Sequence, residues 1–119
     1  MCLKIMTRET AEAAILDLSG RVVSTENQTD LRDAIRAAVA GQQKNVLLNF
    51  AEVSHIDSSG LGQLVGGYAT VRNNGGQIKF LNVRAPVHEI LRTARLLTVF
   101  ETYNDETEAI RSFRGGSSG

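Results

Sequence analysis

The hydrophobic positions of this chain fall into short apolar runs that alternate with longer stretches of helical spacing. Short runs rich in aliphatic residues, bounded by glycine or polar residues, predict strands. The predicted strands lie at 3–5, 13–18, 46–50, 78–83 and 99–102. A polar turn at 8–12 joins the first two strands, and Gly20 closes the second.

Between these strands, apolar residues recur at intervals of three and four, which is typical of amphipathic helices. The predicted helices cover about 28–40, 58–73, 86–94 and 105–113. An opening hairpin followed by alternating helices and strands predicts an α/β fold with a small mixed sheet. We expect parallel central strands, right-handed crossovers and about four helices, with helices on at least one face.

The composition is that of one globular domain. Of the 119 residues, 42% are hydrophobic and 22% are charged, which is enough to bury a core. We place the domain at residues 1–113. Residues 114–119 are rich in glycine and serine, so we predict a flexible tail outside the fold, of the kind that cloning leaves behind.

Charge and cysteine content argue against several classes of protein. Thirteen basic and thirteen acidic residues give a formal net charge of +0, without the basic excess that direct nucleic-acid binding favours. Cys2 is the single cysteine, so the chain has no internal disulfide and no zinc-ligand set. It contains neither a signal-peptide core nor an apolar run long enough to insert into a membrane. We therefore expect a cytoplasmic protein without metal or cofactor.

The sequence also argues against an enzyme. The glycines at 60, 62 and 66 miss the spacing of a dinucleotide fingerprint by one residue, and no acidic residue follows about 20 positions later. A hydrolase would need Ser58 with Asp57 and with His55 or His88, but the Gly-x-Ser-x-Gly pattern is absent. We assign no catalytic residue and expect that the chain is not an enzyme.

The most informative segment is Asp57-Ser58-Ser59, which joins a strand to a helix. Oxygen-bearing side chains are favoured there because they accept hydrogen bonds from the first backbone N–H groups of the helix. The same N–H groups and the positive end of the helix dipole are also receptive to a phosphate. The residues alone leave both explanations open: Asp57 and Ser58 are helix caps, or the helix start is a place where phosphate matters.

Two glycines inside the same helix also need an explanation. Gly62 and Gly66 lie four apart, and each costs about 0.8–1.0 kcal/mol relative to alanine in a helix interior. We expect close packing of the helix on the sheet to offset this cost, with a partner contact as the second explanation. Leu61 is expected to pack in the core or at its rim. His88 and the scattered arginines and lysines are expected at the surface.

The motif Asp57-Ser58-Ser59-Gly60-Leu61-Gly62 resembles the signature of the STAS domain, and more narrowly that of bacterial anti-sigma-factor antagonists. The resemblance covers residues 3 to 113 in the order and spacing of elements. It includes the glycine pair at 75–76 before a strand and the short apolar helix that follows. A six-residue motif with matching context on both sides is more specific than an isolated glycine pattern.

The resemblance implies a phosphorylation switch. In such antagonists the serine after the aspartate accepts phosphate from a partner that is both an anti-sigma factor and a serine kinase, and this position is Ser58 here. The unphosphorylated antagonist binds that partner and frees a sigma factor, and a serine phosphatase resets it. The implied partner-binding residues are Asp57, Ser59, Gly60, Leu61 and Gly62 at the helix start, with Val23 and Ser24 in the loop after Gly20.

The loop after Gly20 departs from the family pattern. Relatives usually carry an aspartate there, whereas this chain has Val23 and Ser24. The departure keeps a second interpretation open. In that interpretation the chain is a constitutive scaffold subunit of a stress-signalling or lipid-transport assembly, and Ser58 only caps the helix.

Overall fold

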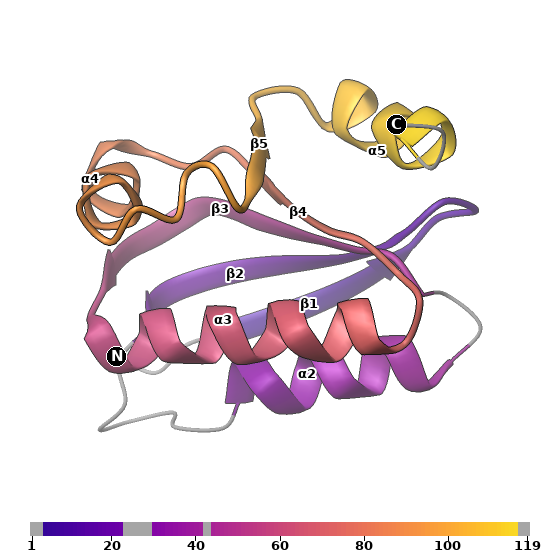
Figure 1. Cartoon of the computed structure of the whole chain (residues 1–119), viewed down its shortest axis with the longest axis horizontal. Helices are drawn as coiled ribbons and strands as arrows, with labels where there is room; N and C mark the ends of the chain where they lie inside the picture. The colour runs from indigo at the N-terminus through magenta and orange to yellow at the C-terminus, as the bar shows by residue number, and fades with distance from the viewer. Residues whose placement is uncertain (1–3, 23–29, 42–43, 117–119) are drawn as a thin grey trace.

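The computed structural model describes residues 4–22, 30–41 and 44–116, and it contains one five-stranded mixed sheet (Figure 1). The strands lie side by side in chain order: β1 (Lys4–Glu9), β2 (Ala14–Val22), β3 (Val46–Ile56), β4 (Ile78–Leu81) and β5 (Glu101–Tyr103). β1 is antiparallel to β2, and every other neighbouring pair is parallel. The mixed sheet and its parallel centre confirm the predicted fold class.

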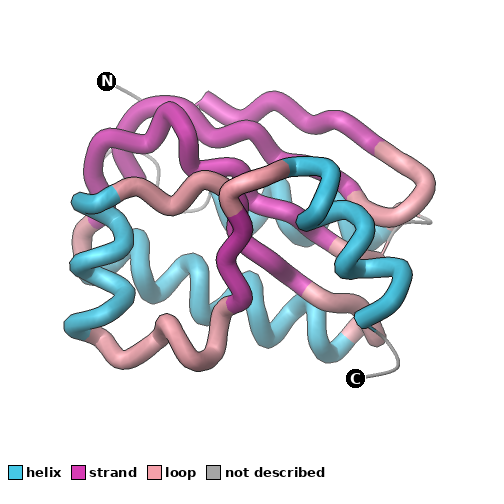
Figure 2. Tube along the Cα trace, turned by 90° about the horizontal axis from the view of Figure 1, so that it is seen from above, coloured by secondary structure: helices cyan, strands magenta, loops and turns pink. Residues whose placement is uncertain are grey.

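Within the described residues four helices pack around this sheet: α2 (Asp30–Ala40), α3 (Ser58–Asn73), α4 (Ala85–Thr93) and α5 (Glu106–Gly116). Figure 1 shows α2 and α3 side by side beneath the sheet and α5 on its other side. Seen from above, α4 and α5 lie at separate ends of the molecule with β5 between them (Figure 2). Helix α5 continues past the predicted end at Phe113 to Gly116, and residues 117–119 lie outside the described part.

The first hairpin differs from the prediction at both of its strands. β1 runs on to Glu9, so the predicted turn at 8–12 is shorter, and the Thr10 side chain closes it by donating to the Ala13 carbonyl at 3.0 Å. Gly20 does not close β2, which continues to Val22. Gly20 has a φ of 110°, and register shifts around it let the strand bend and continue.

The largest difference is the length of β3, which has 11 residues instead of the five predicted. The sequence pattern stops at Phe50 because polar residues follow. In the structure Glu52 and His55 are exposed while Val53 and Ile56 are buried, so the second half of β3 has one wet face. This half pairs with β2 but extends beyond β4, and it carries the chain out to Asp57.

Alternation along the strands gives the sheet two apolar faces. The larger core lies on the side of α2 and α3, and it includes Leu16, Leu48, Phe50, Phe80 and Leu64. The smaller core lies beneath α5, and it consists of Ala13, Ile15, Leu47, Leu81, Ala109 and Phe113. Both faces of the central strands are therefore buried, as parallel strands require.

The close approach between helices α2 and α3 occurs at Gly67. A Cβ on Gly67 would lie 2.5 Å from Ile35 Cδ1 of α2. A Cβ on Gly62 or Gly66 would meet nothing within 4 Å. The prediction that close packing explains Gly62 and Gly66 is therefore wrong, because α3 presents Gly67, and not those two residues, to its neighbour.

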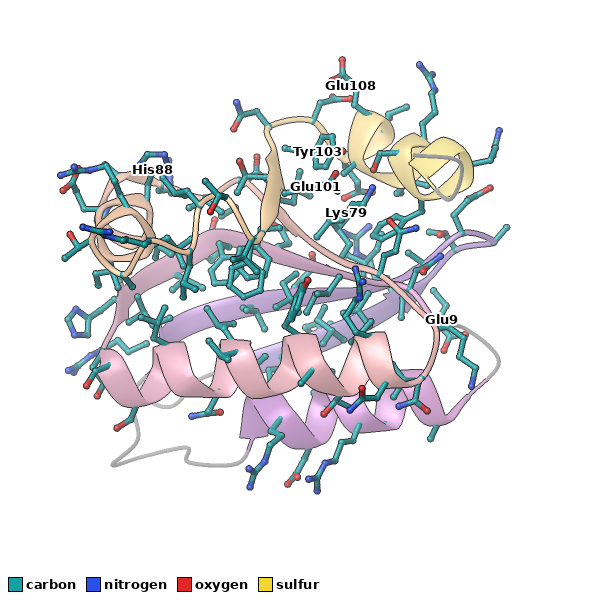
Figure 3. All side chains as sticks on the ribbon, in the orientation of Figure 1. Glu9, Lys79, His88, Glu101, Tyr103 and Glu108 are labelled. Carbon is teal, nitrogen blue, oxygen red and sulfur yellow. The ribbon has the colours of Figure 1, made fainter. Side chains whose placement is uncertain are left out.

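Lys79 contradicts the expectation that the lysines lie at the surface. It is 2% exposed beneath α5, and its Nζ donates to Ser112 Oγ at 2.9 Å. The Glu101 carboxylate lies 3.4 Å from the same nitrogen, and the Tyr103 and Phe113 rings flank it (Figure 3). A buried ammonium needs such partners, because removing an unpaired charge from water is strongly unfavourable and hydrogen bonds and an opposite charge offset that cost.

Candidate functional site

The turn between β3 and α3 is built around the Asp57 side chain. Asp57 has extended backbone angles, φ −106° and ψ −178°, and its Oδ1 accepts a hydrogen bond from Gly60 N–H at 2.7 Å. Its carbonyl accepts from Leu61 N–H at 2.9 Å, which closes the first helical turn. Asp57 is therefore the N-cap of α3, and its negative charge lies at the positive end of the helix dipole.

Ser58 has a different position from its neighbour. It is the first residue of α3, and its side chain is exposed. Asp57 satisfies the Gly60 N–H, so that cap does not depend on the Ser58 hydroxyl. The capping explanation thus applies to Asp57, and Ser58 presents an accessible nucleophilic oxygen at a helix N-terminus.

A groove of about 410 Å³ lies between the start of α3 and helix α4. We call it the Ser58 groove. Its lining residues come from both elements: Ile56, Asp57, Ser58, Leu61, Glu89, Ile90, Thr93 and Ala94. Half of these residues are aliphatic, and the other half, Asp57, Ser58, Glu89 and Thr93, contribute polar groups. The groove therefore places an apolar surface directly beside the exposed serine.

Helix α4 is held in place by its apolar side and by one arginine. Pro86 lies in its first turn, where its missing N–H costs no helical hydrogen bond. Val87 and Leu91 are fully buried in the larger core. Arg84, at the N-cap position, donates to the Ala51 carbonyl of β3 at 3.0 Å. These contacts fix the α4 wall of the groove relative to β3.

The outer side of α4 carries an ion pair next to the groove. Arg92 donates to Glu89 through Nη2 at 2.7 Å and through Nε at 3.1 Å. These hydrogen bonds hold the pKa of the Glu89 carboxyl below its ordinary value. Both side chains are 61% exposed. Glu89 lines the Ser58 groove, whereas Arg92 lines the neighbouring hollow with Arg95.

The structure brings some of the predicted site residues together and separates others. Asp57, Ser58 and Leu61 line one groove, and Leu61 also packs against the core as expected. Ser59 and Gly62 are exposed on α3 outside the groove, whereas Gly60 is buried and its N–H is bound by Asp57. The predicted contacts at Val23 and Ser24 lie outside the described residues.

Sequence reasoning missed the contribution of α4 to this site. The helix itself was predicted, but its position beside Ser58 follows from the second half of β3, which was predicted as a connector. Polar residues such as Glu52 and His55 interrupt the apolar pattern of this half, and in the structure they are exposed to solvent. His88 is exposed on α4, as expected (Figure 3).

Two further findings concern the described residues alone. Within them, no group of three or more His, Cys, Asp or Glu side chains is arranged to hold a metal ion. None of the helices in this part of the chain is long and apolar enough to cross a membrane.

The chain thus combines a five-stranded mixed sheet with a capped, serine-bearing helix start beside a groove. The chain belongs to the STAS domain family, whose model matches residues 4–109. The predicted resemblance to this family is confirmed.

One relative of known name matches part of the chain. The chain is 30% identical over 69 residues to an anti-sigma F factor antagonist from Paenibacillus polymyxa. The match covers 58% of this chain and 59% of that protein, which is less than two thirds of either.

Solved structures show the same fold at lower identity. The anti-sigma factor antagonist SpoIIAA in its unphosphorylated form has a TM-score of 0.80 at 24% identity, over 94% of this chain and 97% of that one. A sulfate transporter family protein from Wolinella succinogenes has a TM-score of 0.77 at 12% identity, over 92% and 91%. At these identities the structures establish the fold.

Proposed function

We propose that this protein is an anti-sigma-factor antagonist that is switched by phosphorylation of Ser58. In its unphosphorylated form it sequesters an anti-sigma factor with serine kinase activity and so releases a sigma factor. A serine phosphatase returns the phosphorylated form to the active pool. The protein acts in the cytoplasm by binding and not as an enzyme.

The observation that carries the proposal is the separation of roles between Asp57 and Ser58. Asp57 caps the helix through Gly60 N–H, and Ser58 is exposed on the first turn. A kinase can therefore modify Ser58 without removing this cap. The positive end of α3 favours a negative group at this position.

Phosphorylation changes this surface strongly without requiring a new fold. A phosphoryl group adds about −1.5 to −2 charges and three acceptor oxygens. On Ser58 this charge stands beside the Asp57 carboxylate and at the mouth of an apolar groove. A partner that buries the groove would have to desolvate the phosphate, and that cost disfavours the complex.

The similar proteins also support an antagonist function. The curated relative from Paenibacillus polymyxa is an anti-sigma F factor antagonist. SpoIIAA from Bacillus, which shares the fold, has been solved in a phosphorylated form with a TM-score of 0.65 to this chain. By analogy we assign the partner-binding role to the turn into α3 and its first residues, with Asp57, Ser59, Gly60, Leu61 and Gly62, and to Val23 and Ser24.

The direct test is intact-mass analysis with peptide mapping of the protein isolated from its own cells, during growth and under stress. The expected result is one phosphoryl group on Ser58, with an occupancy that changes between the two conditions. Ser59 is the internal control, because it is exposed on the same helical turn. Phosphate on Ser59 alone, or none in any condition, would contradict the proposal.

A second candidate is favoured by the loop after Gly20, where Val23 and Ser24 replace the aspartate usual in antagonists. In this alternative the domain is a constitutive scaffold subunit of a stress-signalling or lipid-transport assembly. Stoichiometric co-purification with the same partners, regardless of phosphate on Ser58, would favour it.

A further inference from the structure

A charged pair on α4 lies at the edge of the Ser58 groove, with one member, Glu89, in the groove lining and the other, Arg92, in the neighbouring hollow. Glu89 lines the groove, and Arg92 holds the Glu89 carboxylate from the next turn of α4. Arg92 directly precedes Thr93, which also lines the groove. Arg92 itself lines the neighbouring hollow, and its guanidinium meets the edge of the groove at the Glu89 carboxylate, 2.7 Å from Nη2.

The existing pair is of a kind that breaks easily. Both partners are mostly exposed, and ion pairs at such positions contribute little to stability because water and salt screen them. A phosphate on Ser58 would offer Arg92 a competing partner. It has a larger charge and three acceptor oxygens, and its geometry suits a guanidinium.

The same phosphate would repel the Glu89 carboxylate, whereas it would attract the Arg92 guanidinium. Glu89 and Ser58 line one groove, so a phosphoryl group brings like charges to its two walls. Asp57 adds a further negative charge on the α3 side. On β3 and α4, the other titratable groups near this end of the molecule are the exposed His55 and His88. Arg92 is the cation that already lies against Glu89.

We propose that phosphate on Ser58 takes Arg92 from Glu89, and that the new Ser58 phosphate–Arg92 pair closes the Ser58 groove. This inference rests on the proposed assignment of Ser58 as the phosphorylated residue. The apolar lining from Leu61 and Ile90 is open to a partner in the unphosphorylated form and covered by the guanidinium in the phosphorylated form. The switch then works by exchange of one ion pair on a rigid fold.

The test uses the full chain with phosphoserine incorporated genetically at position 58, so that no kinase is needed. The second pKa of the phosphate is followed by 31P NMR in wild type, Arg92→Gln and Glu89→Gln. Arg92→Gln should raise this pKa by about 0.3 units or more, because it removes a cation that favours the dianion. Glu89→Gln should lower it. Arg111→Gln, an exposed arginine on α5, should leave it unchanged.

Closure of the groove has its own readout. A soluble paramagnetic agent should relax the Ile90 methyl group less in the phosphorylated protein than in the unphosphorylated one. Arg92→Gln should restore the relaxation. An Arg92→Gln titration identical to that of Arg111→Gln would overturn the pairing, and equal relaxation of the two wild-type forms would overturn the closure.

This design separates the inference from the proposed function. If Arg92→Gln shifts the pKa of the Ser58 phosphate but the protein from cells carries no phosphate on Ser58, the proposed function alone is contradicted. If the protein from cells carries phosphate on Ser58 but Arg92→Gln leaves the pKa of that phosphate unchanged, the inference alone is contradicted.

Discussion

The Asp57 carboxylate and the Gly60 N–H form a 2.7 Å hydrogen bond that spans the position of Ser58 in the sequence. Asp57 is half-buried and Ser58 is exposed, although the two residues are adjacent. Stability and the proposed phosphorylation switch can therefore be altered separately at this helix start. The first two predictions below make use of that separation.

The capping role of Asp57 predicts a difference in stability between two neighbouring variants. Asp57→Ala should lower the free energy of unfolding by about 0.5–2 kcal/mol, because it leaves Gly60 N–H without its acceptor. Ser58→Ala should change it by less than about 0.5 kcal/mol. Urea unfolding followed by circular dichroism measures both. An equal loss in the two variants would show that Ser58 also caps the helix.

The proposed switch predicts opposite binding by two Ser58 variants. Ser58→Ala should bind the anti-sigma factor, because it adds no charge to the groove, and it should resist phosphorylation, because it has no hydroxyl to accept the phosphate. Ser58→Asp should bind weakly, because it places a permanent negative charge at the groove mouth. Isothermal titration with the purified anti-sigma factor provides the comparison, and Asn104→Asp, at an exposed position between β5 and α5, is the control for added charge. Equal affinity of Ser58→Ala and Ser58→Asp would rule out the switch.

Two of the four glycines inside α3, Gly62 and Gly67, should respond differently to alanine. Gly62→Ala should stabilise the protein by up to about 1 kcal/mol, since a Cβ there meets nothing and alanine is the better helix former. Gly67→Ala should gain less, because Ile35 Cδ1 of α2 must move. Thermal and urea unfolding give the two values. A Gly67→Ala variant more stable than Gly62→Ala would contradict the packing described above.

Gly62→Ala also tests the remaining explanation for that glycine. With close packing excluded, a partner contact is the remaining explanation for a glycine at this helical position. The variant should then fold more stably and yet bind the anti-sigma factor more weakly. Unchanged affinity would show that the partner does not need a glycine at this position.

The Arg8–Asp17 pair predicts a pH dependence of stability. Arg8 Nε donates to Asp17 at 2.6 Å, and this hydrogen bond, with a second from Asn49, lowers the pKa of the Asp17 carboxyl. A carboxyl with a lowered pKa in the folded state contributes stability above its unfolded pKa of about 3.9. That contribution is lost as the pH falls below this value and through the folded pKa.

Asp17→Asn should therefore flatten the acid limb of a plot of melting temperature against pH. Asp33→Asn is a suitable control, because Asp33 is exposed on α2. Near neutrality Asp17→Asn should be the less stable protein, and the two curves should run parallel there. Below about pH 4 the melting temperature of wild type should fall more steeply than that of Asp17→Asn, so that the gap between them narrows. Identical acid limbs for wild type and Asp17→Asn would contradict the assignment.

Local chemistry explains which parts of this fold were predictable. The start of α3 could be located from Asp57 because a cap is a property of a few adjacent residues. The end of β3 could not, because Val53 and Ile56 are strand residues only in the context of β2 and the core. The groove was missed for the same reason, since its two walls come from elements about 30 residues apart.

Burial of single residues depended on neighbours that a sequence pattern does not identify. Lys79 alternates with apolar residues and so resembles the wet side of a half-buried strand, yet α5 covers that side. Among the glycines of α3, the one that needs to be small is set by the position of Ile35 on another helix. Periodicity indicates that a helix has a buried side, but not which element will lie against it.

The identity between sheet order and chain order has a consequence for how the domain is assembled during synthesis. Each strand joins the open edge left by the strand before it, so no later segment has to insert between two that are already paired. A chain that emerges from the ribosome with its N-terminus first can add β3, β4 and β5 in turn, and the Asp57 turn is formed before α4 exists to complete the groove. The groove beside Ser58 is therefore complete only once the chain has been made as far as Ala94.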